Sequence, residues 1–261
     1  MRPIQERIKI VVGCDRNYFL KAKELWKSLD WWNYEVHVLC IGFNIPSDIP
    51  NNFKCIRVEL DELKSYRPNF PKNRPFYVTI EGGEFLDYFD YQDDDIIVSI
   101  DADMIMQRDF NDRELYFLEQ LKPLQVVGSL SGYPPVSVEQ EYNNLKPIKP
   151  FSEMNLDSIK REKIICAGVV VCTAKTYRDV IYNCYFSNLD SWIEKIQHHA
   201  LGQLLLNACV MKFGKIVYMP QSFHDAFWFV DTPTSIKEGK LYSNCNLTLF
   251  NHTKFDPRFK F

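Results

Sequence analysis

The stretch Asp95-Ile-Ile-Val-Ser-Ile-Asp-Ala-Asp-Met104 decides the fold class of this chain of 261 residues. Residues Asp95 to Ile100 form a nearly continuous apolar run, which is typical of a strand buried on both faces of a parallel sheet. Asp101 and Asp103 follow this strand directly, and open α/β sheets bind ligands beyond the carboxyl ends of their strands. The stretch therefore predicts an α/β protein with a ligand site at this strand end.

Strand-like and helix-like segments alternate along the rest of the chain. The predicted strands are 8–12, 35–41, 54–60, 95–100, 124–130, 163–172, 215–219 and 246–251, and the predicted helices are 19–29, 76–89, 113–121, 174–186 and 192–211. This alternation predicts a mostly parallel central sheet with helices on both faces. No repeat or linker interrupts it, so we expect one domain over residues 1–261, with a long proline-rich loop at about 131–162 and a basic C-terminal segment.

Composition narrows the functional class. The chain has 31 Lys and Arg against 34 Asp and Glu, a net charge of −3, which disfavours a broad nucleic-acid-binding surface. No apolar run approaches the roughly 20 residues of a membrane helix, and the N-terminal residues do not resemble a signal peptide. The eight cysteines contain no CxxC pair and no zinc-ligand spacing. These features predict a chain without a transmembrane segment in a reducing, cytoplasmic compartment.

Asp101 and Asp103 predict a metal site. Side chains alternate along an extended chain, so both carboxylates should point to the same side, with the small Ala102 between them. Two converging carboxylates repel unless a cation lies between them, and Mg²⁺ or Mn²⁺ takes such oxygen ligands together with substrate phosphates. Solvation of an acidic loop is the alternative, and the buried strand immediately before the pair makes it the weaker one.

The run from Ile97 to Met104 resembles the DxD signature of nucleotide-sugar glycosyltransferases of the GT-A fold, especially the glycogenin and bacterial galactosyltransferase type of family eight. Three later segments resemble further motifs of that family in the same order: a strand with Ala-Gly, a helix with Asp-Gln-x-x-Leu-Asn, and a last strand with a metal-binding His. They are Ile165-Cys-Ala-Gly-Val-Val-Val171, Leu201-Gly-Gln-Leu-Leu-Leu-Asn207 and Leu249-Phe-Asn-His-Thr-Lys254. The resemblance spans about residues 8–260 and implies a GT-A-like α/β domain, the nucleotide-diphospho-sugar transferase fold.

The resemblance also implies roles for single residues. His252 would join Asp101 and Asp103 in holding Mn²⁺ or Mg²⁺, which bridges the diphosphate of a UDP-sugar, and Gln203 would lie beneath the anomeric carbon as a candidate catalytic residue. The first loop would contact the nucleoside, and the Ala-Gly strand would let the sugar approach the backbone. The candidate residues for binding the nucleotide sugar are Val12, Gly13, Cys14, Asp15, Arg74, Ala102, Ala167, Gly168, Lys254 and Arg258.

Several of these assignments have an equal structural alternative. Asp15 is also suited to cap the helix that follows it. Lys254 and Arg258 would close over the diphosphate as a charge clamp, or they belong to a frayed, solvated tail. Asp225 lies in the aromatic segment Phe223-His-Asp-Ala-Phe-Trp228 and is a second candidate catalytic residue, near an acceptor sugar that stacks on the rings; packing of the same rings on the core is the alternative.

The chain departs from the family pattern at one place that bears on activity. Gly202 stands where the helix motif usually begins with Asp, so the role of that carboxylate is absent or has moved. The sequence as a whole predicts a metal-dependent glycosyltransferase with a UDP-sugar as donor and retention of anomeric configuration. The acceptor is open, with a glycan, a lipid-linked sugar or a protein favoured over a nucleic acid. A nucleotidyltransferase and a non-catalytic domain that binds sugar nucleotides are the alternatives.

Overall fold

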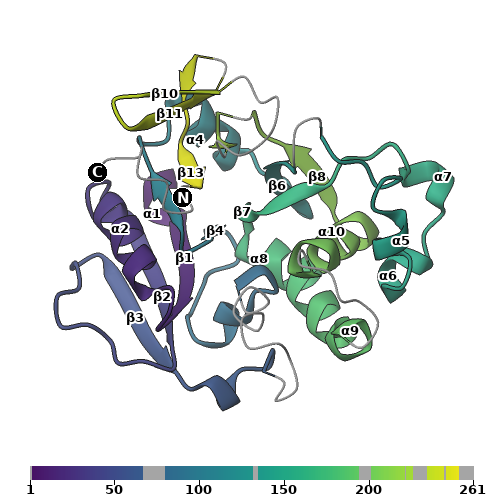
Figure 1. Ribbon diagram of the computed structural model, residues 1–261, viewed down its shortest axis with the longest axis horizontal. Coiled ribbons are helices and arrows are strands. Elements are labelled where there is room, and N and C mark those ends of the chain that lie inside the picture. Colours follow the sequence, from purple (N-terminus) through teal and green to yellow (C-terminus); the bar gives the residue numbers. More distant parts are fainter. Residues whose placement is uncertain are drawn as a thin grey trace.

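A computed structural model describes residues 2–66, 80–131, 135–193, 201–220, 222–225, 234–243 and 245–252. A seven-stranded sheet lies at its centre, in the order β3-β2-β1-β4-β7-β6-β8 (Figure 1). The strands are β1 (Ile8–Asp15), β2 (Glu35–Ile41), β3 (Phe53–Val58), β4 (Ile96–Ile100), β6 (Gln125–Leu130), β7 (Ile165–Thr173) and β8 (Lys215–Tyr218). Neighbouring strands are parallel except at β7, which is antiparallel to both β4 and β6. The predicted mostly parallel sheet is confirmed.

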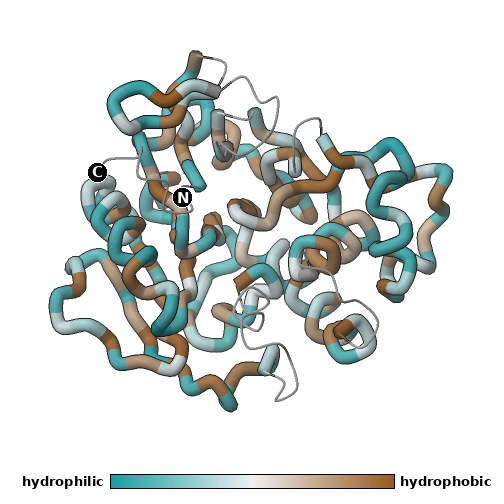
Figure 2. The backbone as a smooth tube through the Cα atoms, viewed as in Figure 1, coloured by the Kyte–Doolittle hydropathy of each residue, from teal (hydrophilic) through white to brown (hydrophobic). Residues whose placement is uncertain are grey.

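Helices cover both faces of this sheet. The longer ones are α2 (Phe19–Asp30), α4 (Asp112–Glu119), α9 (Asn183–Ile193) and α10 (Leu201–Phe213), and the short ones include α1 (Ile4–Arg7) and α8 (Ala174–Thr176). Along β1, Ile10 and Val12 belong to the apolar cluster that contains residues of α2, whereas Val11 belongs to the cluster that contains residues of α9 and α10. Figure 2 shows apolar residues concentrated on the central strands and on α9 and α10. Within the described part of the chain, no helix is both long and apolar enough to span a membrane.

The structure contains two small sheets that the sequence analysis did not predict as such. One contains β5 (Met104–Met106), β13 (Phe250–His252) and β9 (His224–Asp225), and the other contains β10 (Thr234–Lys237), β11 (Lys240–Ser243) and β12 (Asn246–Leu247). The predicted strand 246–251 is thus divided between β12 and β13. Strands of two to four residues contain too little alternation to stand out in a sequence.

Two predicted elements differ from the structure. The loop expected at 131–162 contains three single-turn helices in its described part, α5 (Tyr142–Leu145), α6 (Lys149–Ser152) and α7 (Leu156–Ile159). Leu145, Ile148 and Phe151 are buried in the same apolar cluster as α10, so this segment is packed on the core. The helix expected over 76–89 is broken in its described part, because Gly83 has φ 82° and separates the helical residues Ile80 and Glu81 from the 3₁₀ helix η2 (Glu84–Asp87).

Candidate metal centre

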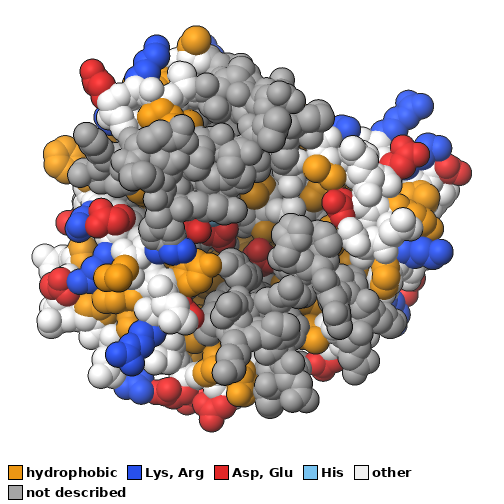
Figure 3. Space-filling view, in the orientation of Figure 1, with side chains coloured by type: hydrophobic (Ala, Val, Ile, Leu, Met, Phe, Trp, Pro, Cys, Tyr) orange, Lys and Arg blue, Asp and Glu red, His pale blue; other side chains and the backbone are white. Residues whose placement is uncertain are grey.

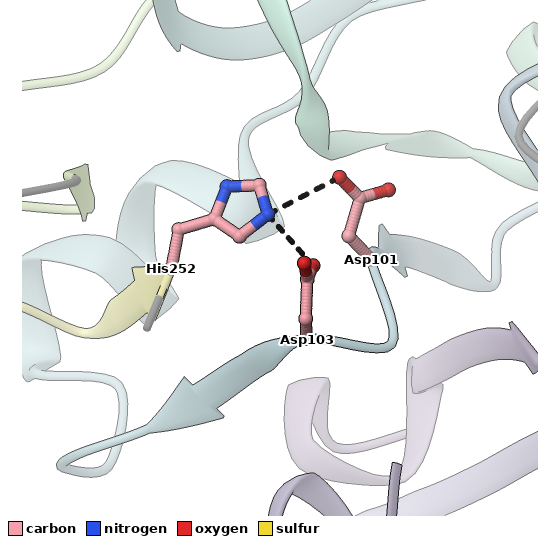
Figure 4. A group of neighbouring side chains, drawn as sticks. All are labelled: Asp101, Asp103 and His252. Carbon is pink, nitrogen blue, oxygen red and sulfur yellow. Dashed lines mark hydrogen bonds and ion pairs between the residues drawn. The ribbon is translucent and has the colours of Figure 1, made fainter. Parts of the chain in front are cut away.

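Asp101, Asp103 and His252 meet at the carboxyl end of β4 (Figure 4). One ligand atom from each residue lies within 4.8 Å of the other two. His252 Nε2 is 2.7 Å from Asp103 Oδ1 and 3.6 Å from Asp101 Oδ2, and all three side chains are largely buried. The structure therefore brings together the three residues that the sequence analysis named as metal ligands.

A tight turn, and not an extended chain, places the two carboxylates on one side. The Met104 amide donates to the Asp101 carbonyl at 3.3 Å, which closes a turn over residues 101–103. The expected alternation of side chains is therefore the wrong reason for their convergence. Ala102 lies buried in the core cluster at this turn. The chain then enters β5, whose Met104 pairs with His252 of β13, and this pairing sets the imidazole beside the turn.

The donor set fits a hard divalent cation. Burial opposes ionisation of Asp103, but the hydrogen bond and the charge of His252 outweigh it and lower the pKa of this carboxyl. Two carboxylates with one imidazole suit Mn²⁺ and Mg²⁺. A bound ion would take the place of the contact between His252 and Asp103 as the partner of both groups. Figure 3 shows acidic side chains in the hollowed centre of the face of the molecule that Figure 1 displays.

Strand β7 passes directly beside this centre. The Gly168 carbonyl accepts a hydrogen bond from the Asp101 amide at 3.1 Å. A Cβ atom at Gly168 would lie 2.8 Å from Met104 Cε, 3.3 Å from Asp101 Oδ2 and 3.3 Å from His224 Cε1. A side chain here would press on Met104, Asp101 and His224, so glycine suits the close approach of β7 to the acidic turn. Ala167 is buried next to it, so both residues of the predicted Ala-Gly pair lie at the site.

Helix α10 is tied to β7 by two side-chain amides. Gln203 Oε1 accepts from the Ala167 amide at 3.1 Å, and its Nε2 donates to Ser131 Oγ at 3.0 Å. Asn207 Oδ1 accepts from the Ile165 amide at 2.9 Å, and its Nδ2 donates to the Ile165 carbonyl at 2.9 Å. Gln203, the predicted catalytic residue, is thus held against the strand that borders the metal centre.

The residues predicted from the first strand have mostly structural contacts. Val12 and Cys14 are buried in the core, and burial raises the pKa of the Cys14 thiol. A Cβ atom at Gly13 would lie 2.8 Å from Ile80 Cγ1, so this glycine also admits a close neighbour. Asp15 accepts hydrogen bonds from the Tyr18 amide at 2.8 Å and from Asn17 Nδ2 at 3.1 Å. Asp15 thus closes the turn before α2, and the expected helix cap is not formed, because the N-cap residue of α2 is Tyr18 and no side chain caps it.

Four predicted residues have no described side chain. Arg74, Lys254 and Arg258 lie outside the described residues. Asp225 has a described backbone, which pairs with Asn251 in the parallel ladder between β9 and β13, but its side chain is outside the described set. Their roles stay predictions.

Sequence analysis missed a set of buried polar residues around the centre. Within the described residues, Glu81 Oε2, the Tyr185 hydroxyl, both His224 ring nitrogens and the Asn251 amide lack hydrogen-bond partners. No spacing rule links these residues, and only the clustering of polar atoms in space reveals them. Glu81 also accounts for the glycine at position 202, where the helix motif usually has Asp, because an ideal Cβ at this position would overlap Glu81 Oε2.

His224 makes acid stability of the metal-free protein testable. Burial, with a smaller contribution from His252, lowers its pKa from 6.5 to about 3. Between pH 6.5 and about 3, His224 is protonated in the unfolded chain and neutral in the folded protein. The free energy of unfolding therefore falls as pH falls, by at most about 1.4 kcal/mol per pH unit. In urea denaturation between pH 6.5 and 4, we expect the free energy of unfolding of His224→Gln to fall less steeply with pH than that of the unmodified protein. Equal slopes in the two proteins would contradict this.

The sheet order, with β7 reversed, and the acidic turn after β4 define the GT-A class of α/β fold. No protein-family model matches the chain, and no curated protein matches its sequence. Among solved structures, the chain is similar to the galactosyltransferase LgtC in complex with donor and acceptor sugar analogues, with 16% identity, a TM-score of 0.62, and 94% of this chain and 86% of that one covered. It is also similar to an active-site mutant of LgtC in which a glutamine is replaced by glutamate, with 15% identity, a TM-score of 0.62 and the same coverage. The likeness confirms the fold that the sequence resemblance implied.

Proposed function

We propose that this chain is a metal-dependent glycosyltransferase that uses a nucleotide diphosphate sugar, with UDP as the nucleotide, as its donor. The observation that carries the proposal is the convergence of Asp101, Asp103 and His252 within 4.8 Å at the carboxyl end of β4. That edge of an α/β sheet is the usual ligand site, and the fold is shared with a galactosyltransferase whose structure was solved with donor and acceptor analogues.

The residues divide into three tasks in this proposal. Asp101, Asp103 and His252 hold Mn²⁺ or Mg²⁺, and the bound ion supplies positive charge for the departing diphosphate. Gly168 leaves room for the sugar beside the acidic turn, because it has no side chain. Gln203, which α10 carries and a hydrogen bond holds against β7, is proposed to face the anomeric carbon, and the active-site glutamine of the similar LgtC supports this assignment.

The remaining assignments extend the same scheme. Lys254 and Arg258 are proposed to approach the diphosphate, and Arg74 the diphosphate or the donor sugar. Asp15 and the backbone of residues 12–14 are proposed to contact the nucleoside, and Asp225 the acceptor. We propose retention of anomeric configuration and an acceptor that is a glycan, a lipid-linked sugar or a protein. The net charge of −3 argues against nucleic acid as the acceptor.

A donor screen tests the function. Purified protein is mixed with UDP-galactose, UDP-glucose, other UDP-sugars and GDP-sugars, each with Mn²⁺ or with EDTA, and thermal unfolding and nucleotide release are measured. We expect one UDP-sugar to raise the unfolding temperature and to release UDP only when Mn²⁺ is present, because a ligand that binds the folded state stabilises it. Binding without release of UDP would instead support the non-catalytic alternative. A folded protein that responds to no donor would contradict the proposal.

A further inference from the structure

The carboxylate of Glu81 occupies the space that a side chain at position 202 would fill. An ideal Cβ at Gly202 would overlap Glu81 Oε2 and would lie 2.6 Å from Glu81 Cδ and 3.1 Å from the Tyr185 hydroxyl oxygen. Gly202 belongs to the first turn of α10, whereas Glu81 comes from the segment before η2. The segment before η2 therefore places the carboxyl group of Glu81 beside Gly202, where α10 itself has no side chain.

This acid is held in place by contacts of its own segment. The Tyr177 hydroxyl is 3.1 Å from the carbonyl oxygens of both Ile80 and Glu81 and donates to them. Gly83 has φ 82°, and a Cβ there would lie 2.6 Å from the Tyr177 ring, so the turn fits only glycine. Glu84 then accepts hydrogen bonds from Ser65. The backbone on both sides of the Glu81 carboxylate is thus anchored.

The position of Glu81 is adjacent to the proposed sugar site. Gly202 precedes Gln203, which bonds to Ala167, and the next residue of β7, Gly168, lies against Asp101. Burial, and then the negative charge of Asp101, raise the pKa of Glu81, so the two carboxyl groups lie within electrostatic reach of each other. Glu81 therefore lies against the turn of α10 that leads into Gln203.

Glu81 is an unusual residue for a purely structural position. Its side chain is only 7% exposed, and Oε2 has no partner in the described residues. The Tyr185 hydroxyl nearby is fully buried and is also without a partner there. Buried polar groups are almost always hydrogen-bonded in proteins, so two neighbouring groups without protein partners have hydrogen-bonding capacity that a ligand can satisfy.

We propose that Glu81 and Tyr185 form a subsite for the hydroxyl groups of the donor sugar, in which Glu81 accepts a hydrogen bond from one sugar hydroxyl. The inference rests on the proposed function. A carboxyl group and a phenol offer both hydrogen-bond donors and acceptors to the hydroxyl groups of a sugar. A second metal ion fits this pair poorly, because hard cations take several carboxylate or carbonyl oxygens.

Isothermal titration with Mn²⁺ present tests the subsite. Glu81→Ala is compared with the unmodified protein using UDP, UDP-galactose and UDP-glucose as probes. We expect binding of the preferred UDP-sugar to weaken by roughly tenfold or more, since the site loses a hydrogen bond specific to the sugar. Binding of UDP alone should stay the same. Equal weakening of UDP and UDP-sugar, or no weakening of either, would overturn the inference.

Moving the acid from position 81 to position 202 distinguishes a sugar-binding role of Glu81 from a purely packing role. Gly202→Asp alone should lose affinity for the UDP-sugar, because its side chain overlaps Glu81. Glu81→Ala combined with Gly202→Asp returns a carboxylate to the same space and should recover much of the affinity that Glu81→Ala loses. Recovery is the expected result, and no recovery in a folded double variant would count against the subsite.

Asp87→Asn is the matched control, because this acid lies on the same segment and bonds to Tyr182 instead. It should leave the ratio of UDP-sugar to UDP affinity unchanged, and thermal unfolding confirms that each variant is folded. If the unmodified protein binds no UDP-sugar, the proposed function itself fails. If it binds one and Glu81→Ala behaves identically, only the subsite fails.

Discussion

Asp103→Ala is expected to abolish the Mn²⁺-dependent stabilisation by a nucleotide sugar and to slow nucleotide release on the order of a hundredfold to a thousandfold. The substitution removes one of the three converging ligands and leaves His252 without its partner at 2.7 Å. The remaining Asp101 and His252 atoms, 3.6 Å apart, offer too few ligands to hold the ion against water. Thermal unfolding with Mn²⁺ and with EDTA measures the effect.

Two further variants make this test specific. Asp90→Ala removes an exposed acid from the same acidic region, and it should leave the Mn²⁺-dependent shift in unfolding temperature unchanged. Asp103→Asn keeps the shape of the side chain but not its charge, so it should also lose the shift. A metal-dependent shift that persists in Asp103→Ala would refute the assigned metal site.

Asn207→Leu is expected to lower the free energy of unfolding by about 3 kcal/mol, from two buried backbone groups that each cost about 1–3 kcal/mol when unpaired. Asn207 is fully buried, and its amide satisfies both the N–H and the carbonyl of Ile165 at 2.9 Å. These bonds occur where the register between β6 and β7 shifts, so the sheet does not replace them. Leucine fills a similar volume but can neither donate nor accept.

Urea denaturation measures this loss. Asn188→Leu is a suitable control, because this half-buried amide bonds to the Cys184 carbonyl of its own helix, and its replacement should cost about 0.5 kcal/mol or less. A loss below about 1 kcal/mol in Asn207→Leu would mean that β7 finds other partners for Ile165. Because Asn207 and Gln203 lie on the same helix, the variant should also weaken nucleotide-sugar binding.

Much of the architecture could be predicted from local sequence patterns. Strand β4 was predicted close to its observed bounds, and so were β1, β2, β6 and β7. Each of these strands is a run of several apolar residues, which a sequence shows directly. The same reasoning failed for the single-turn helices α5 to α7 and for the strands β5 and β9, which are too short to show a period.

The candidate site was only partly predictable. Asp101 and Asp103 follow a recognisable strand, so their neighbourhood was evident, but the turn that makes them converge was not. His252 was named through its resemblance to a motif, and nothing in its own surroundings in the sequence indicates a ligand. Glu81 belongs to no motif and lies in a segment predicted as a helix weakened by Gly82 and Gly83.

The sequence by itself determined the α/β class, the strand that ends in Asp101 and the candidate ligands, because burial periodicity and residue chemistry are local properties. Tertiary structure alone decided which groups meet. The pairing of β5 with β13 brings His252 to Asp103 across 149 residues of chain, and the packing of Glu81 against Gly202 puts an acid where α10 has no side chain. Such contacts depend on how distant segments pack, and the pattern within a single segment does not contain that information.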